Sequence, residues 1–223
     1  MRDLNQKAMI YRATYIDERG RETTEIHNDG ETLRMTVRGV VFEGESFDDF
    51  EPMSPVSLDG LGFTVNLGAL CDCVIECEIP VSVMEGDHVE SAFLHARLEL
   101  GAALPNQGID KEVLGLRLVF GGKTYASKGG SGHYEDELLE LQNALPEGTS
   151  IKACITCAFS DYSPCGNGLF GGLACFRTVP EKYLAVESKA ALFALWDERA
   201  GFVQETYLCD AYRRRKPGAG YRG

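Results

Sequence analysis

Four cysteines in the C-terminal third of the chain have the residue type and part of the spacing of a zinc site. Cys154 and Cys157 form a C-x2-C pair, a spacing that lets two thiolates close around one tetrahedral ion. Cys175 and Cys209 follow at longer intervals, and the turn-rich segment 161–172 would return the chain towards the first pair. We therefore predict that Cys154, Cys157, Cys175 and Cys209 bind a structural Zn²⁺, with no open position for a catalytic water.

This prediction requires the chain to turn near Thr156. If the strand expected at 151–155 continued unbroken, Cys154 and Cys157 would point to opposite faces and could not share an ion, which leaves buried free thiols as an alternative. A redox-active pair is a second alternative. Such a pair normally lies at the start of a helix, and residues 158–168 have no helical pattern.

Cys165 is the substitute fourth ligand if Cys209 proves remote. The remaining cysteines have a different pattern. Cys71, Cys73 and Cys77 lie at alternate positions of an apolar strand face over 71–83, where Pro80 is a candidate interruption. We interpret these three as core thiols.

No other motif indicates catalysis. The histidines, His27, His88, His95 and His133, are scattered and match no metal-enzyme pattern. The stretch Gly121-Gly122-Lys123-Thr124 resembles part of a phosphate-binding loop, but Arg117 stands where the first glycine is required. A site near the 121–133 loop, with His133 as a base, is the enzymatic alternative.

The elements around these residues are mainly strands. Alternating apolar positions predict strands over 33–42, 71–83, 92–100, 114–120, 151–155 and 202–209. A 3.6-residue period predicts helices over 134–145 and 189–199. We expect an α+β, mainly β fold: an antiparallel β-sandwich or partial barrel with two short helices and a C-terminal, zinc-ribbon-like region built on the four cysteines. The predicted division is 1–125 and 126–223, with one continuous domain as the alternative.

Composition narrows the class of partner. The net charge is −12, which disfavours nucleic acid and anionic membranes because both need a positive footprint. Residues 211–223 differ, since they carry Arg213, Arg214, Arg215, Lys216 and Arg222 and no acid. We expect this tail to dock on the acidic body or to stay solvated. Eight cysteines without a signal-peptide pattern predict a reducing, cytoplasmic location.

Two segments resemble an uncharacterised family of bacterial proteins. They are Cys154–Pro164, followed by Phe170-Gly171 and Cys175-Phe176-Arg177, and the ending with Cys209 and Gly218–Gly223. The resemblance covers mainly residues 150–223 and implies a bacterial source, but no activity.

These observations favour a non-enzymatic, zinc-stabilised cytoplasmic protein whose acidic surface binds a protein partner, in an inhibitor, immunity-like or adaptor role. The alternatives are an enzyme with a site near the 121–133 loop and a nucleic-acid-binding zinc module that uses the basic tail.

Overall fold

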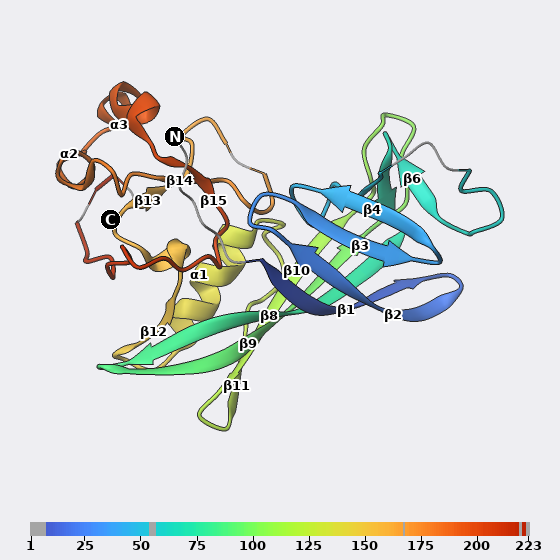
Figure 1. Cartoon of the computed structure of the whole chain (residues 1–223), viewed down its shortest axis with the longest axis horizontal. Coiled ribbons are helices and arrows are strands. Elements are labelled where there is room, and N and C mark those ends of the chain that lie inside the picture. The colour runs from blue at the N-terminus through green and yellow to red at the C-terminus, as the bar shows by residue number, and fades with distance from the viewer. Residues whose placement is uncertain (1–7, 54–56, 167, 219, 222–223) are drawn as a thin grey trace.

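A ten-stranded antiparallel sheet forms most of the protein (Figure 1). The computed structural model describes residues 8–53, 57–166, 168–218 and 220–221. The strand order is β11-β10-β9-β8-β1-β2-β3-β4-β5, and β12 pairs with β8 outside this path. The strands are β1 (Met9–Asp17), β2 (Gly20–Asn28), β3 (Leu33–Val37), β4 (Val40–Gly44), β5 (Glu51–Pro52), β8 (Cys73–Glu85), β9 (His88–Leu100), β10 (Glu112–Phe120), β11 (Lys123–Ala126) and β12 (Thr149–Lys152).

The β8–β9 hairpin runs along the length of the molecule (Figure 1). One side of β8 changes neighbour part-way, because residues 74–78 pair with β1 and residues 82–85 pair with β12. Pro80 lies between these two stretches. Since proline has no N–H to donate, it is tolerated where one neighbour ends and the next begins, and β8 is unbroken there.

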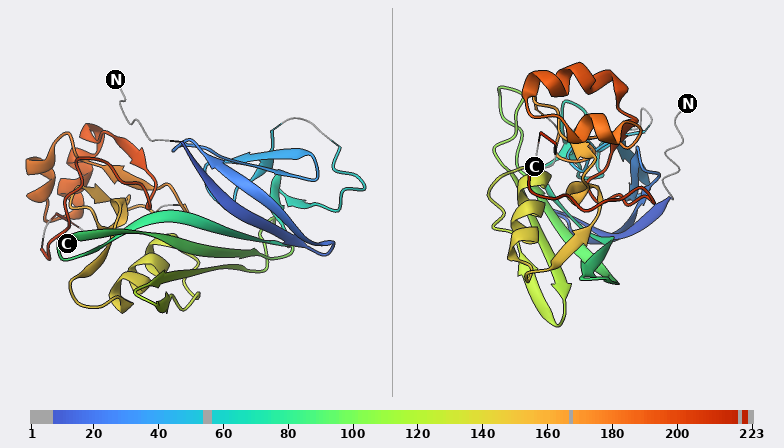
Figure 2. Two further views of the ribbon diagram at one scale, coloured as in Figure 1. Left: turned by 60° about the horizontal axis from the view of Figure 1, so that its bottom comes forward. Right: turned by 90° about the vertical axis from the view of Figure 1, so that its left-hand side faces the viewer.

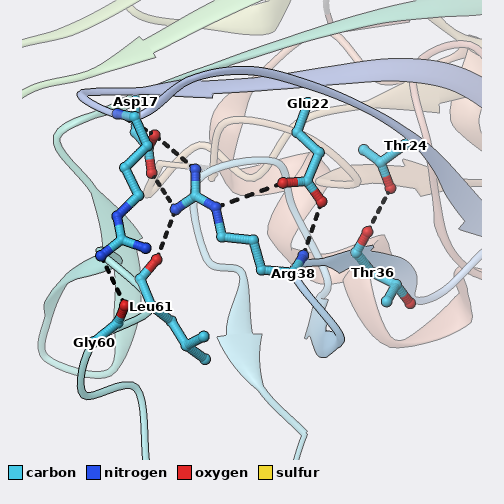
Figure 3. Close-up of polar contacts among 8 residues, drawn as sticks. Asp17, Glu22, Thr24, Thr36, Arg38, Gly60 and Leu61 are labelled. Carbon is cyan, nitrogen blue, oxygen red and sulfur yellow. Dashed lines mark hydrogen bonds and ion pairs between the residues drawn. The ribbon is translucent and has the colours of Figure 1, made fainter.

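A buried ion pair between Arg38 and Asp17 stabilises the turn between β3 and β4 (Figure 3). Arg38 has a positive φ of 49° and Gly39 follows with 77°, as a tight hairpin turn requires. The Arg38 guanidinium donates to both carboxylate oxygens of Asp17, at 2.6 and 2.7 Å, and to the carbonyl oxygen of Leu61 at 2.9 Å. It also lies over the ring of Phe63. One side chain thus joins β1, the β3–β4 turn and the segment that precedes β6 (Thr64–Asn66).

The helix α1 (Tyr134–Ala144) packs on β10 and β11 and supports the free edge of β12. The side-chain amide of Gln142 donates to the carbonyl oxygen of Thr149 at 3.1 Å and accepts from the N–H of Ile151 at 2.8 Å. Because the Gln142 side chain hydrogen-bonds these backbone groups, the outer edge of β12 is satisfied without pairing to another strand. The buried core is continuous from Tyr11 to Val203 and includes residues on both sides of position 125.

The C-terminal region forms a smaller unit at one end of the sheet (Figure 2). Its three-stranded sheet has the order β13-β14-β15. The elements are the 3₁₀ turn η1 (Cys154–Thr156), β13 (Ser160–Asp161), β14 (Leu173–Cys175), α2 (Pro180–Leu184), α3 (Lys189–Leu195), the 3₁₀ turn η2 (Trp196–Glu198) and β15 (Gly201–Val203). The chain also contains a small hairpin of β6 and β7 (Ala69–Cys71).

The prediction of a mainly β, antiparallel fold is confirmed, but the sheet does not close into a barrel. Five element predictions are wrong in detail. The strand predicted over 151–155 ends at Lys152, before the η1 turn, and the strand predicted from Cys71 begins at Cys73, because Asp72 has a positive φ of 50°. The strand predicted over 33–42 is two strands, because Arg38-Gly39 forms a turn. The strand predicted over 202–209 is limited to β15, and the helix predicted over 189–199 ends in the η2 turn. Among the described residues, no helix is both long and apolar enough to cross a membrane.

Candidate functional site

The chain turns at the predicted C-x2-C pair. Residues 154–156 form the η1 turn, in which the N–H of Cys157 donates to the carbonyl oxygen of Cys154 at 3.0 Å. The strand before the pair ends at Lys152, so the unbroken strand that would separate the two thiols does not form. The N–H of Cys154 donates to the carbonyl oxygen of Tyr207 at 2.7 Å, which brings the segment leading to Cys209 beside the pair.

Cys175 reaches the same region through β14. Its strand neighbours are Ser160 on β13 and Gly201 on β15. Arg177 connects it to the last predicted ligand, because its backbone N–H bonds Cys175 and its side chain bonds Cys209. Burial raises the pKa of Cys154, and the other three predicted ligands raise it further through their charge.

The structure does not contain a formed metal centre at these cysteines. Over the described ranges, no group of three or more His, Cys, Asp or Glu side chains is arranged to hold a metal ion. All eight cysteines are free thiols, and Cys165 is exposed on a turn. The zinc-ribbon-like arrangement and its ion stay a prediction.

An acidic cleft of about 460 Å³ lies where the sheet meets the C-terminal unit. The β2–β3 turn, the end of β4 and the segment around β15 enclose it. Its lining residues are Gly30, Glu31, Glu45, Phe170, Gly171, Asp197, Arg199, Ala200, Gly201, Phe202, Val203 and Gln204. Three carboxylates thus share the cleft with one cation. The Arg199 guanidinium lies over the rings of Trp196 and Phe202, 5.3 and 4.9 Å from their centroids.

Buried hydrogen bonds join the two walls of the cleft. The side-chain amides of Asn28 and Gln204 exchange hydrogen bonds of 2.7 and 3.0 Å. The side-chain oxygen of Asn28 also accepts from the N–H of Gly30 at 2.8 Å. Since Asn28 and Gln204 are 176 residues apart, their bonds fix the β2–β3 turn against the chain after β15. The cleft is therefore preformed.

Glu205 lies directly behind the cleft and is fully buried. Its carboxylate accepts from the N–H of Gly171 at 2.8 Å and from the hydroxyl of Tyr162 at 2.9 Å. Burial raises the pKa of Glu205 to about 7, although these donors oppose the shift. Because the residue is 0% exposed and its carboxylate is hydrogen-bonded, we assign it a structural role.

The 121–133 loop is held in place by the side chain of Glu137. The buried carboxylate of Glu137 accepts from the N–H groups of Gly129 and Ser131 at 2.8 and 2.9 Å, and from the Ser131 hydroxyl at 2.7 Å. Ser131 is therefore engaged with Glu137, while His133 precedes α1 and is exposed. These contacts hold the glycine-rich loop against the helix.

The basic tail packs on its own protein. The N–H of Ala158 donates to the carbonyl oxygen of Arg213 at 2.7 Å, and the N–H of Arg215 donates to that of Thr156 at 2.9 Å. The Arg215 guanidinium donates to the carbonyl oxygen of Cys157 at 2.9 Å, and that of Arg213 lies over Phe159. Arg222 of the predicted tail lies outside the described residues.

A family model matches residues 9–160, and its description is a family of unknown function (DUF6304). The chain belongs to this family. The predicted resemblance to an uncharacterised family is confirmed, but the match covers residues 9–160 and not mainly 150–223. It includes the large sheet, α1 and the C-x2-C pair. No curated protein and no solved structure matches this DUF6304 chain significantly.

The cleft could not be found from the sequence of this DUF6304 protein. Glu31, Glu45 and Asp197 are three acids among the 34 in the chain, and no spacing distinguishes them. They meet because β3 and β4 bring two of them to the sheet end on which the C-terminal unit packs.

Proposed function

We propose that this protein is a non-enzymatic binding protein that recognises a basic protein partner at the acidic cleft, with a zinc ion stabilising its C-terminal region. An inhibitor, immunity-like or adaptor role fits this description. The observation that carries the proposal is the preformed cleft in which Glu31, Glu45 and Asp197 outnumber one cation.

Charge and shape both support a basic partner. Carboxylates at a concave surface raise the local concentration of cations and speed the encounter with a basic protein. Two aromatic residues, Phe170 and Phe202, also line the cleft, and aromatic side chains are enriched at the centres of protein interfaces. A Lys or Arg side chain entering the cleft would find carboxylates for its charge and rings for its stem.

Zinc is supported by the contacts among the cysteine segments. The η1 turn and the hydrogen bond between Cys154 and Tyr207 support this part of the proposal, because they bring the chain that leads to Cys209 beside the C-x2-C pair. Four thiolates that converge on one ion would form a tetrahedral Zn²⁺ site. A cytoplasmic location belongs to the same proposal, because a reducing compartment would keep eight thiols free for such a role.

The partner is tested with matched charge reversals on the full chain. The Glu31→Lys/Glu45→Lys variant changes the cleft, and Glu147→Lys/Glu187→Lys makes the same net change at exposed positions elsewhere. We expect a tagged chain in its native cells to retain one basic protein at near-equal stoichiometry, measured by quantitative mass spectrometry. Only the cleft variant should lose it. Equal retention by both variants would refute the proposal.

Zinc is tested by elemental analysis of the purified chain. We expect about one equivalent of zinc, which Cys154→Ser or Cys209→Ser removes and Cys71→Ser leaves in place. Cys165→Ser distinguishes the substitute ligand, because it should have no effect if Cys209 binds the ion. A zinc-free protein that binds no added Zn²⁺ would remove this part of the proposal without affecting the partner test.

A further inference from the structure

A second groove lies between α1 and the end of the chain, at a different place from the acidic cleft. Its volume is about 480 Å³, within the range typical of small-molecule sites. Figure 1 shows the last segment of the chain beside α1. The lining residues are Glu135, Leu139, Gln142, Ser150, Ile155, Thr156, Arg214, Arg215, Lys216 and Pro217.

The charge of this groove is opposite to that of the whole protein. Three cations and one acid line it, whereas the chain carries a net charge of −12. Arg215 is engaged with the carbonyl oxygens of Cys157 and Ser160. Arg214 and Lys216 are exposed, and within the described part of the chain neither has a carboxylate at ion-pair distance. Two cations are thus available to an anion.

Ser150 provides an independent indication. The residue is 2% exposed, and its hydroxyl is buried without a hydrogen-bond partner among the described residues. A buried hydroxyl without a partner costs free energy, and proteins rarely leave one in place. Since Ser150 lines the groove, a ligand oxygen bound there would supply the missing partner.

The rest of the lining combines the polar residues Glu135, Gln142 and Thr156 with an apolar wall. Leu139, Ile155 and Pro217 form this apolar wall. Inorganic phosphate alone would leave this wall uncovered. An oxyanion that carries a short hydrocarbon chain would meet the cations with its head and the apolar wall with its chain.

We propose that the groove between α1 and the tail binds a small organic oxyanion, a carboxylate or phosphate monoester with a short apolar chain. Arg214 and Lys216 attract the head group, and Ser150 donates a hydrogen bond to it. The function of the basic tail is then to form one wall of a ligand site. This site is independent of the partner and the zinc ion proposed above.

The test is titration of the full chain with hexanoate and hexyl phosphate, followed by NMR chemical shifts and calorimetry. We expect one or both to bind and to shift the amide signals of Ser150, Ile155 and Lys216. Whichever binds more tightly identifies the head group. Hexanol and hexylammonium, which lack the negative charge, should bind at least about tenfold more weakly.

Three variants and two controls decide the roles. Arg214→Gln, Lys216→Gln and Ser150→Ala should each weaken binding about three- to tenfold. Lys123→Gln removes an exposed cation elsewhere, and Thr149→Val removes a neighbouring buried hydroxyl outside the groove. Both controls should bind normally. Ser150→Ala should unfold at the same temperature as the unmodified protein or higher, because its hydroxyl has no partner to lose.

The absence of binding by both anions would overturn the proposal. So would equal binding of hexanol, or groove variants that bind as well as the two controls.

Discussion

The buried ion pair between Arg38 and Asp17 allows a quantitative test of how this fold is held together. The Asp17 side chain is only 3% exposed and that of Arg38 14%. Replacing Arg38 with Met would leave the carboxylate buried with one remaining donor, the backbone N–H of Arg19 at 2.9 Å. Removing one partner of a buried pair typically costs ~3–5 kcal/mol. The Arg19 donor and the partial exposure of Arg38 place the expected loss near ~3 kcal/mol.

In a chain of this length, that loss corresponds to a fall of roughly 6–12 °C in melting temperature. The measurement is thermal or urea unfolding followed by circular dichroism. The matched control is Arg34→Met, because Arg34 pairs with Glu43 on the exposed face of the sheet. An exposed pair contributes less than about 1 kcal/mol, so the control should lose no more than a few degrees.

The pH dependence separates the ion pair from simple packing. Burial, the largest single effect, would raise the pKa of Asp17, but the hydrogen bonds from Arg38 and from the Arg19 N–H, together with the charges of both arginines, outweigh it and lower the pKa. The pair therefore stabilises the fold above the unfolded pKa of about 3.9, and the contribution is lost as the pH falls through the lower folded value. The difference between Arg38→Met and the unmodified protein should shrink at low pH. Equal effects of the Arg38 and Arg34 substitutions, or a difference that is constant from about pH 7 to pH 3, would refute the reasoning.

Three further predictions concern Glu137, Gln142 and Glu205. Glu137→Ala should cost roughly 2–3 kcal/mol and speed hydrogen exchange at the Gly129 and Ser131 amides, because its carboxylate holds both. Burial would raise the pKa of Glu137, but these hydrogen bonds lower it. The loss of stability caused by Glu137→Ala should therefore diminish as the pH falls through the folded pKa, and a loss that does not change with pH would count against this role. Gln142→Leu should lose about 1–3 kcal/mol and expose the Ile151 amide to exchange, and full protection there would contradict the edge-strand role of Gln142. Glu205→Gln should have the opposite pH behaviour. Burial raises the pKa of Glu205 to about 7, so ionisation of this carboxyl destabilises the fold. In urea unfolding, the stability of the variant relative to the unmodified protein should therefore rise by up to roughly 3–4 kcal/mol between about pH 5 and pH 8. A gain that does not grow with pH would rule this out.

Local patterns predicted the middle of the chain well. The alternation over 71–83 and 92–100 corresponds to β8 and β9, and the helix over 134–145 corresponds to α1. These elements combine a clear period with one buried face, so that local sequence and packing agree. β1 and β2 were not predicted. β1 has the alternating pattern of a strand, with Tyr11, Ala13 and Tyr15 buried, so its sequence was sufficient to predict it; in β2 only Ile26 is a buried apolar residue, and its sequence was not sufficient.

The candidate site was predictable only where it is local. The zinc prediction required a turn near Thr156, and this turn is found in η1. The acidic cleft and the groove at the tail are each lined by residues far apart in sequence, such as Glu31 and Asp197 in the cleft or Ser150 and Lys216 in the groove. Side-chain periodicity describes which face a residue occupies, but not which distant segment covers that face. Such sites therefore require the tertiary structure.

The change of neighbour along β8 determines how the chain can be shortened. A fragment that ended at residue 125 would lack β12 and would leave residues 82–85 as an unprotected edge, open to pairing with another molecule. It would also lose Ala126, the last residue of β11, so truncation there should yield an aggregating fragment. The stretch matched by the family, 9–160, retains both neighbours of β8, but it would lose Phe170, Leu173 and Val203 from the same buried core, so the full chain is the piece to express.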